Sequence, residues 1–260
     1  MEKNLTEYPV TAYACQVLKV TPLTAETFLI DLESQASENL SYHAGQYLKL
    51  ELDVNNDGHL QSLFYSIANG FNPEQPEHLQ LLIQNSSELT DKVLKCLSEK
   101  TRLNTSVSVT LPMGRAFLQT DLNLPHILIA AGSGISKIKC ISEAILRQQP
   151  DAQMHIYWSN KQINDFYLLD EFQRWKDQNK NLEFTPILES ADENWQGRAG
   201  YIYEIIEEDF ENLTGVQAYL CGSPKMVYGT IDKLNHKGLV EKNCYSDVFE
   251  FAPREQRRAI

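Results

Sequence analysis

A glycine-containing turn in the second half of the chain has the residue types that bind phosphate. Gly132-Ser133-Gly134 follows the apolar run 127–131 and opens a predicted helix. Glycine lets the backbone come close to an anion, and the free N–H groups at a helix start attract it. A turn that uses glycine for steric reasons alone is the alternative. Lys137 stands where the dinucleotide fingerprint G-x-G-x-x-G has its third glycine.

Two further segments carry candidate site residues. Tyr219-Leu220-Cys221-Gly222-Ser223-Pro224-Lys225-Met226 ends a predicted parallel strand, so Gly222 and Ser223 are expected at the carboxyl edge of a sheet, where ligands bind. Cys221 faces the same edge, although a lone cysteine is more often a small buried hydrophobic residue. Tyr65-Ser66-Ile67-Ala68-Asn69 lies on a predicted strand and, taken alone, is ordinary strand sequence.

The residues before 122 have the pattern of a small antiparallel β-barrel. Asn55-Asn56-Asp57-Gly58 is a strong reversal signal, because these residues tolerate positive φ. One helix is expected over 90–100. Short strands are expected over 13–20, 27–32, 46–52, 64–68, 79–84 and 106–111.

Beyond residue 122 strands and helices alternate, which predicts an α/β domain with a doubly wound parallel sheet. The sequence therefore predicts two domains, 1–121 and 122–260. The expected strands are 127–131, 154–158, 182–188, 217–221 and 244–249, and the expected helices are 136–149, 165–178, 201–207 and 225–236.

The amino-acid composition argues against several classes of binding partner and cofactor. A net charge of −12 argues against nucleic acid, and no apolar run approaches the length of a membrane span. The five cysteines are scattered, which predicts a reducing, cytoplasmic setting. The C-x4-C-x2-C spacing of a plant-type iron–sulfur cluster is absent, and the six histidines are dispersed, so no metal site is expected.

The order of the short motifs supports a resemblance. A-G-Q-Y, Y-S-I-A-N, A-G-S-G-I-S and Y-L-C-G-S-P-K-M, in this order, resemble the ferredoxin–NADP reductase superfamily. Within it the chain is most similar to the small bacterial NAD(P)H:flavin reductases. The resemblance runs from about Tyr13 to Phe251, so it covers nearly the whole chain.

The resemblance implies a flavin-binding barrel followed by a nicotinamide dinucleotide domain. Ser66 matches the catalytic serine whose hydroxyl lies near flavin N5, which accepts a hydride from nicotinamide C4. Such chemistry needs positioning and no charged base, because the two ring systems carry the redox step. The other implied cofactor-binding residues are Tyr65, Ile67, Ala68 and Asn69 for the flavin ring, Gly132, Ser133 and Gly134 for the dinucleotide phosphates, Cys221, Gly222, Ser223 and Met226 near the nicotinamide, and Phe251 or Phe249 as an aromatic cover.

The expected reaction is an NAD(P)H-dependent reduction of a flavin, with reduced flavin passing to a monooxygenase or to ferric iron. FMN, FAD and riboflavin all stay open as the flavin, as do NADH and NADPH as the donor. Ser159, Lys161 and Arg198 are the residues that could meet the 2′-phosphate of NADPH.

The flavin half departs from the family pattern at both phosphate positions. The family signature R-x-Y-S has Leu63 in the place of arginine, and the segment 85–90 lacks the family's glycine. The flavin is then a diffusible substrate held by its ring, or Lys49, His59 or Arg115 replaces the missing charge. Alternatively the domain has lost flavin binding and serves as a partner-binding module, or the chain is an electron-transfer subunit with a tightly bound flavin and a protein acceptor.

Overall fold

The computed structural model describes residues 7–35 and 38–254, and the chain divides into two compact units. The first unit contains the residues up to Gln119 together with Ser136–Pro150, and the second contains Thr120–Ile135 and the residues from Asp151 onward. These units differ from the predicted halves 1–121 and 122–260 mainly in one helix, which clusters with the first unit. The assignment of flavin binding to residues 1–121 and of dinucleotide binding to residues 122–260 stays a prediction.

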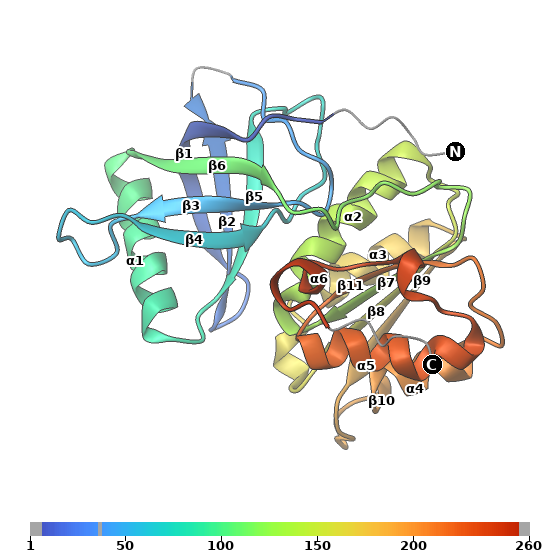
Figure 1. Cartoon of the computed structure of the whole chain (residues 1–260). Coiled ribbons are helices and arrows are strands. Elements are labelled where there is room, and N and C mark those ends of the chain that lie inside the picture. The colour runs from blue at the N-terminus through green and yellow to red at the C-terminus, as the bar shows by residue number, and fades with distance from the viewer. Residues whose placement is uncertain (1–6, 36–37, 255–260) are drawn as a thin grey trace. The chain divides into compact units, whose positions relative to one another are not determined.

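Six antiparallel strands form the sheet of the first unit, in the order β4-β3-β6-β1-β2-β5 (Figure 1). Just beyond β4, the N–H of Ala68 donates to the carbonyl of Gln80 in β5 at 2.8 Å, so the two edge strands meet at one end. The sheet is a half-barrel, in agreement with the predicted fold class. Its strands are β1 (Thr11–Pro22), β2 (Thr27–Ser34), β3 (Tyr47–Leu52), β4 (Gln61–Ser66), β5 (His78–Gln84) and β6 (Ser106–Met113).

The core of the half-barrel follows from the alternation of side chains along each strand. In β3, Leu48 and Leu50 are fully buried while the residues between them are partly exposed. Helix α1 (Glu88–Leu103) adds buried residues from one face and begins at Ser87, whose hydroxyl accepts the N–H of Thr90. The predicted reversal at 55–58 is present, with positive φ at Asn56 and Gly58.

Six parallel strands form the sheet of the second unit, in the order β10-β9-β8-β7-β11-β12. The chain runs outward from β7 through β8 and β9, and β11 then adds to the other side of β7. This reversal makes the carboxyl ends of β7 and β11 the switch point of a doubly wound sheet, as predicted. The strands are β7 (His126–Ala131), β8 (Met154–Asn160), β9 (Leu182–Leu188), β10 (Arg198–Ala199), β11 (Gln217–Cys221) and β12 (Cys244–Tyr245).

Helices cover both faces of this parallel sheet. On one face, α4 (Ile202–Asp209) and α5 (Pro224–Leu234) pack in one core cluster with β7 and β11. On the other, Phe172 of α3 (Leu169–Gln178) stacks on Phe184 of β9 at a ring-centroid distance of 5.2 Å. Both faces of the sheet are therefore apolar, which explains the continuous apolar run of β7.

Two predicted elements are wrong in their extent. The strand expected over 244–249 is only Cys244–Tyr245, because the chain turns at Ser246, whose hydroxyl accepts the N–H of Val248, and then forms the short helix α6 (Val248–Phe251) with Asp247 as its N-cap residue. The helix expected from Asp165 begins at Leu169, since Ile163–Asp165 forms a separate 3-10 turn.

A buried histidine lies at the start of β7. The ring of His126 is fully buried, and its Nε2 lies 2.7 Å from the hydroxyl of Thr120. Burial lowers the pKa of His126 below its usual value. Burial also lowers the pKa of His155, whose ring packs edge-on against Phe210.

These histidines predict a loss of stability in mild acid. Each ring titrates near pH ~6.5 in the unfolded chain, so below that pH the unfolded state binds more protons than the folded state. The free energy of unfolding is expected to fall below about pH 6.5, by up to roughly 1.4 kcal/mol per pH unit for each ring. Urea unfolding over a pH series measures this dependence. The free energy of unfolding should depend less steeply on pH in His126→Gln than in the wild type. Equal slopes in the variant and the wild type would exclude His126 as a cause.

Candidate functional site

The glycine loop after β7 lies tightly against the end of β11. Gly132, Ser133 and Gly134 form the 3-10 turn η2 (Gly132–Gly134), and Gly132 has a φ of +56° that favours glycine. A Cβ built on Gly134 would overlap the carbonyl of Cys221. The indole N–H of Trp158 in β8 donates to the carbonyl of Gly132 at 2.9 Å. Three neighbouring strands therefore determine the shape of this loop.

The segment after β11 meets the same edge of the sheet. A Cβ on Gly222 would overlap the Cε of Met226 and would lie 3.2 Å from the Cβ of Ala131, the last residue of β7. The hydroxyl of Ser223 accepts the N–H of Met226 at 3.3 Å and so begins α5. The switch point thus brings together most of the residues predicted for the dinucleotide: Gly134, Cys221, Gly222 and Met226, with Gly132, Ser133 and Ser223 adjacent in sequence.

The residues predicted for the flavin ring divide into two groups. Ile67, Ala68 and Asn69 are buried, and the first two have no exposed surface. The N–H of Ile67 donates to the carbonyl of Gln46, which joins this segment to the residue before β3. Tyr65 and Ser66, in contrast, remain partly exposed. Side-chain contact with a ligand is therefore open to these two, while Ile67 and Ala68 are enclosed by the fold.

Burial also affects the phenol of Tyr65. It raises the pKa of Tyr65 to about 12. At neutral pH the phenol therefore keeps its proton and is a hydrogen-bond donor.

Lys49, one of the cations that could replace the missing arginine, does not share the face of β4 that carries Leu63. Leu63 lies directly opposite Leu50, which points into the half-barrel. Lys49 lies opposite Phe64, so its side chain is on the other face of the sheet, where it forms an ion pair with Glu51 at 3.2 Å. His59 and Arg115 lie outside the strands, on exposed segments.

The helix start that follows β5 is capped from within the chain. The hydroxyl of Thr90 accepts the N–H groups of Ser86 and Ser87 at 3.1 and 2.9 Å. The hydroxyl of Ser87 accepts the N–H of Thr90 in return. These donors would otherwise be available to a phosphate, so the second predicted phosphate position is also altered.

Phe249 and Phe251, the two aromatic residues that the resemblance offers as a cover for the flavin, differ in their packing. Phe249 packs against Tyr228 of α5, with ring centroids 5.7 Å apart. Phe251, at the end of α6, is 66% exposed. Phe251 is therefore the ring that is available for contact with a ligand.

The cysteines are all free thiols in the structure. Burial raises the pKa of Cys15, Cys140 and Cys244 to about 12, so these thiols stay protonated and unreactive at neutral pH. Cys221 is only partly buried and lies at the switch point. Within residues 7–35 and 38–254, no group of three or more His, Cys, Asp or Glu side chains is arranged to hold a metal ion.

A surface pocket of about 330 Å³ lies in the first unit. Tyr42, Phe71 and Arg147 are among its lining residues, and the Arg147 guanidinium donates to the carbonyl of Phe71. None of the residues predicted for flavin or dinucleotide lines it.

Sequence reasoning missed the polar residues of helix α2 (Ile135–Gln148). Ser136, Lys139 and Glu143 form hydrogen bonds with the segment that follows β4. A signal was available, because Lys139 and Glu143 stand four residues apart in a helix whose isoleucines predict burial.

Comparisons with known proteins agree with this architecture. The family model "Oxidoreductase NAD-binding domain" matches residues 128–231. The chain is 28% identical over 240 residues to a probable flavin reductase of Vibrio harveyi, covering 91% of this chain and 99% of that protein. It is 26% identical over 239 residues to the CDP-6-deoxy-L-threo-D-glycero-4-hexulose-3-dehydrase reductase of Yersinia pestis, covering 91% of this chain and 68% of that protein.

The structure of the Amycolatopsis cytochrome P450 reductase GcoB has the same fold. It superposes with a TM-score of 0.79 at 23% identity, covering 94% of this chain and 71% of that chain. The chain thus combines the fold of GcoB, a half-barrel and a doubly wound sheet with a glycine loop at its switch point, with an oxidoreductase NAD-binding domain, and it is similar to proteins of the ferredoxin–NADP reductase superfamily. Within the superfamily it is close to the NAD(P)H-flavin reductases. Among the described residues, no helix has the length and apolar character to cross a bilayer.

The close contact at Gly134 predicts a sensitive position. Gly134→Ala is expected to push the loop away from the carbonyl of Cys221, with a loss of about 1–3 kcal/mol in stability from overpacking. Dinucleotide binding should weaken by roughly tenfold, about 1.4 kcal/mol, because the loop loses its shape. Thermal unfolding and NADH titration measure the two effects.

Gly229→Ala in α5 is the matched control. A Cβ at Gly229 meets nothing within 4 Å, so this variant should bind the dinucleotide as the wild type does. If Gly134→Ala bound NADH as tightly as Gly229→Ala, the loop would not hold the phosphates.

Proposed function

We propose that the chain is an NAD(P)H-dependent flavin reductase that uses flavin as a diffusible substrate. The contrast between the two halves carries this proposal. The switch point has a glycine loop of the kind that binds phosphate, whereas the half-barrel has Leu63 and a self-capped helix start at the two positions where the resemblance implies contacts with the flavin phosphate. A flavin held by its ring, with no charged anchor for its phosphate, suits a ligand that enters and leaves.

The switch-point residues fit a dinucleotide. A Cβ on Gly132 would meet nothing within 4 Å, so this position leaves space at the carboxyl edge of the sheet. Helix α2 begins directly after the loop, and the positive end of its dipole favours an anion there. We assign the pyrophosphate to this loop. Cys221, Gly222 and Met226, at the end of the neighbouring strand, are assigned to the nicotinamide.

Tyr65 and Ser66 are the residues that we assign to the flavin ring. Their side chains lie on opposite faces of β4, so they serve different parts of the ligand. Ser66 donates a hydroxyl hydrogen bond near the ring nitrogen that is reduced, and its own carbonyl is held by the hydroxyl of Ser136 at 3.3 Å.

The bound nicotinamide and flavin would supply the redox chemistry themselves, as donor and acceptor of a hydride. The protein contributes binding and orientation, which replace a bimolecular encounter and are worth up to about 7–11 kcal/mol. No side chain has to move a proton in this step. The absence of a catalytic base among the predicted site residues agrees with that chemistry.

NADH is the donor that we expect to be preferred. Arg198, one of the candidate 2′-phosphate ligands, donates to the carboxylates of Glu208 and Asp209 in α4, so its charge is already neutralised. Ser159 is buried. Lys161 is exposed, and a single solvated ammonium adds little affinity for the 2′-phosphate.

An electron-transfer role is the second candidate. A relative from Acinetobacter baylyi, 26% identical over 238 residues, is named as the electron transfer component of anthranilate 1,2-dioxygenase. In that role the flavin would stay bound and a protein would take the electrons. The purified chain would then be yellow, and added flavin would not increase its rate.

We also propose an electron acceptor and a cell compartment for the enzyme. Reduced flavin would be consumed by a monooxygenase or by ferric iron. The five free cysteines favour the cytoplasm as its compartment.

The first experiment is oxidation of NADH and NADPH by the purified chain, with and without FMN, FAD and riboflavin. Oxidation should require added flavin and should be faster with NADH. Ser66→Ala should lower kcat by about tenfold, the value of one lost hydrogen bond of ~1.4 kcal/mol, with an unchanged melting temperature. No oxidation with either nucleotide and any flavin would refute the proposal and favour a partner-binding module.

The flavin phosphate can be tested at β4. Leu63→Arg restores a guanidinium where the family signature has one, and should tighten FMN binding by roughly tenfold, because a charge-assisted hydrogen bond contributes about 1.5–3 kcal/mol. Riboflavin, which has no phosphate, should bind as before. Leu63→Met is the uncharged control. An FMN-to-riboflavin affinity ratio that does not change in fluorescence titrations would contradict this account of Leu63.

A further inference from the structure

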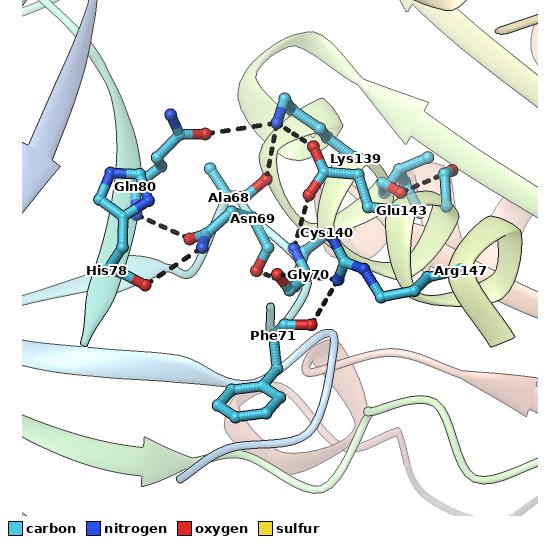
Figure 2. Close-up of polar contacts among 12 residues, drawn as sticks. Ala68, Asn69, Gly70, Phe71, His78, Gln80, Lys139, Cys140, Glu143 and Arg147 are labelled. Atoms are coloured by element: carbon cyan, nitrogen blue, oxygen red, sulfur yellow. Dashed lines mark hydrogen bonds and ion pairs between the residues drawn. The ribbon is translucent and has the colours of Figure 1, made fainter. Parts of the chain in front are cut away.

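Helix α2 contacts the backbone of residues 66–71 along most of its length (Figure 2). Successive turns of the helix each supply a polar side chain to this short segment, which directly follows β4. In the first turn of α2, the Ser136 hydroxyl donates to the Ser66 carbonyl at 3.3 Å. The bonds drawn in Figure 2 run from the Lys139 ammonium to the Ala68 carbonyl (3.4 Å), from the Cys140 thiol to the Asn69 carbonyl (3.0 Å), from the Gly70 N–H to the Glu143 carboxylate (2.7 Å), and from the Arg147 guanidinium to the Phe71 carbonyl.

Lys139 and Glu143 form the central ion pair of this row. They are one helical turn apart, and their side chains are only 6% and 20% exposed. The Lys139 ammonium also lies 3.4 Å from the amide oxygen of Gln80 in β5. The pair therefore joins three elements: the helix, the segment after β4, and β5.

On the side away from α2, hydrogen bonds to β5 hold the same segment. The side-chain oxygen of Asn69 accepts the N–H of Gln80 at 2.7 Å, and its side-chain nitrogen donates to the carbonyl of His78 at 3.2 Å (Figure 2). Residues 68–70 are thus held between β5 on one side and α2 on the other.

The packing of α2 does not depend on the ion pair of Lys139 and Glu143. Ile138, Ile141 and Ile145 of α2 are fully buried and supply the apolar contact. A buried ion pair is weak as a source of net stability, because desolvation of the two charges offsets their attraction. Such a pair instead fixes the position of the segment relative to the helix, because its hydrogen bonds form in only one arrangement of the two.

We propose that Lys139 and Glu143 are positioning residues that set the affinity for flavin, by fixing the backbone of residues 68–70 and with it Tyr65 and Ser66. This proposal rests on the proposed function, because Tyr65 and Ser66 are the residues assigned there to the flavin ring.

The test replaces the pair with apolar residues of similar size. Lys139→Met alone would leave the partly buried Glu143 without its ammonium and can fail to fold, so the main variant is the double substitution Lys139→Met, Glu143→Leu. Removing both charges together avoids that penalty. The matched control is Asp91→Leu, Lys95→Met on α1, an ion pair of the same spacing that is exposed.

The measured quantities are kcat, the KM for riboflavin, the KM for NADH, and the Kd for riboflavin from fluorescence quenching. In the folded double variant we expect the KM and Kd for riboflavin to rise about tenfold or more, as for a misplaced binding group, with the KM for NADH within about twofold of wild type. The control pair should leave all four values unchanged.

Each other outcome counts against the proposal. A folded double variant whose riboflavin Kd stays within about twofold of wild type overturns it. So does a parallel change in both KM values with a lower melting temperature, which would indicate a merely structural role. If the wild type binds riboflavin but does not oxidise NADH, the proposed function fails while the Kd comparison still decides the role of the pair. If the wild type binds no riboflavin, both proposals fall.

Discussion

The end of β11 and the turn after β7 are so close that position 134 has no room for a side chain. The Cys221 carbonyl occupies the space that a Cβ would need, and the Trp158 indole holds the Gly132 carbonyl from the third strand. The loop shape is therefore a property of the parallel sheet as a whole. Because η2 leads directly into α2, the same contact also determines where that helix starts.

Within the first unit, side chains of α2 bond to the backbone of residues 66–71. Two kinds of interaction act there with different effects. The buried isoleucines contribute most of the free energy of association, which grows with the apolar area buried and has little directional preference. The ion pair of Lys139 and Glu143 contributes little net stability but selects one arrangement of the segment after β4.

The flavin half keeps its architecture while both phosphate positions have changed. Leu63 faces Leu50 and extends the apolar lining of the half-barrel, and the α1 start satisfies its own donors through Ser87 and Thr90. At both positions, internal contacts stand where the resemblance implies contacts with the flavin phosphate. A flavin held without such an anchor would dissociate faster, since affinity differences among related complexes arise mostly in the dissociation rate. The proposed use of flavin as a diffusible substrate needs this fast exchange.

Local pattern in the sequence was enough to predict the half-barrel, the doubly wound sheet and the glycine loop at its switch point, because periodicity and turn residues act over a few positions. It failed at 244–249, where a short helix takes the place of most of the expected strand. Only the tertiary structure decided that α2 clusters with the first unit and that Lys139 and Glu143 bond to the segment after β4. Ser136 and Ser66, for example, are 70 positions apart, and no local rule relates residues at that separation. Their contact exists because the folded chain buries both groups together, and buried polar groups must find partners where the fold puts them.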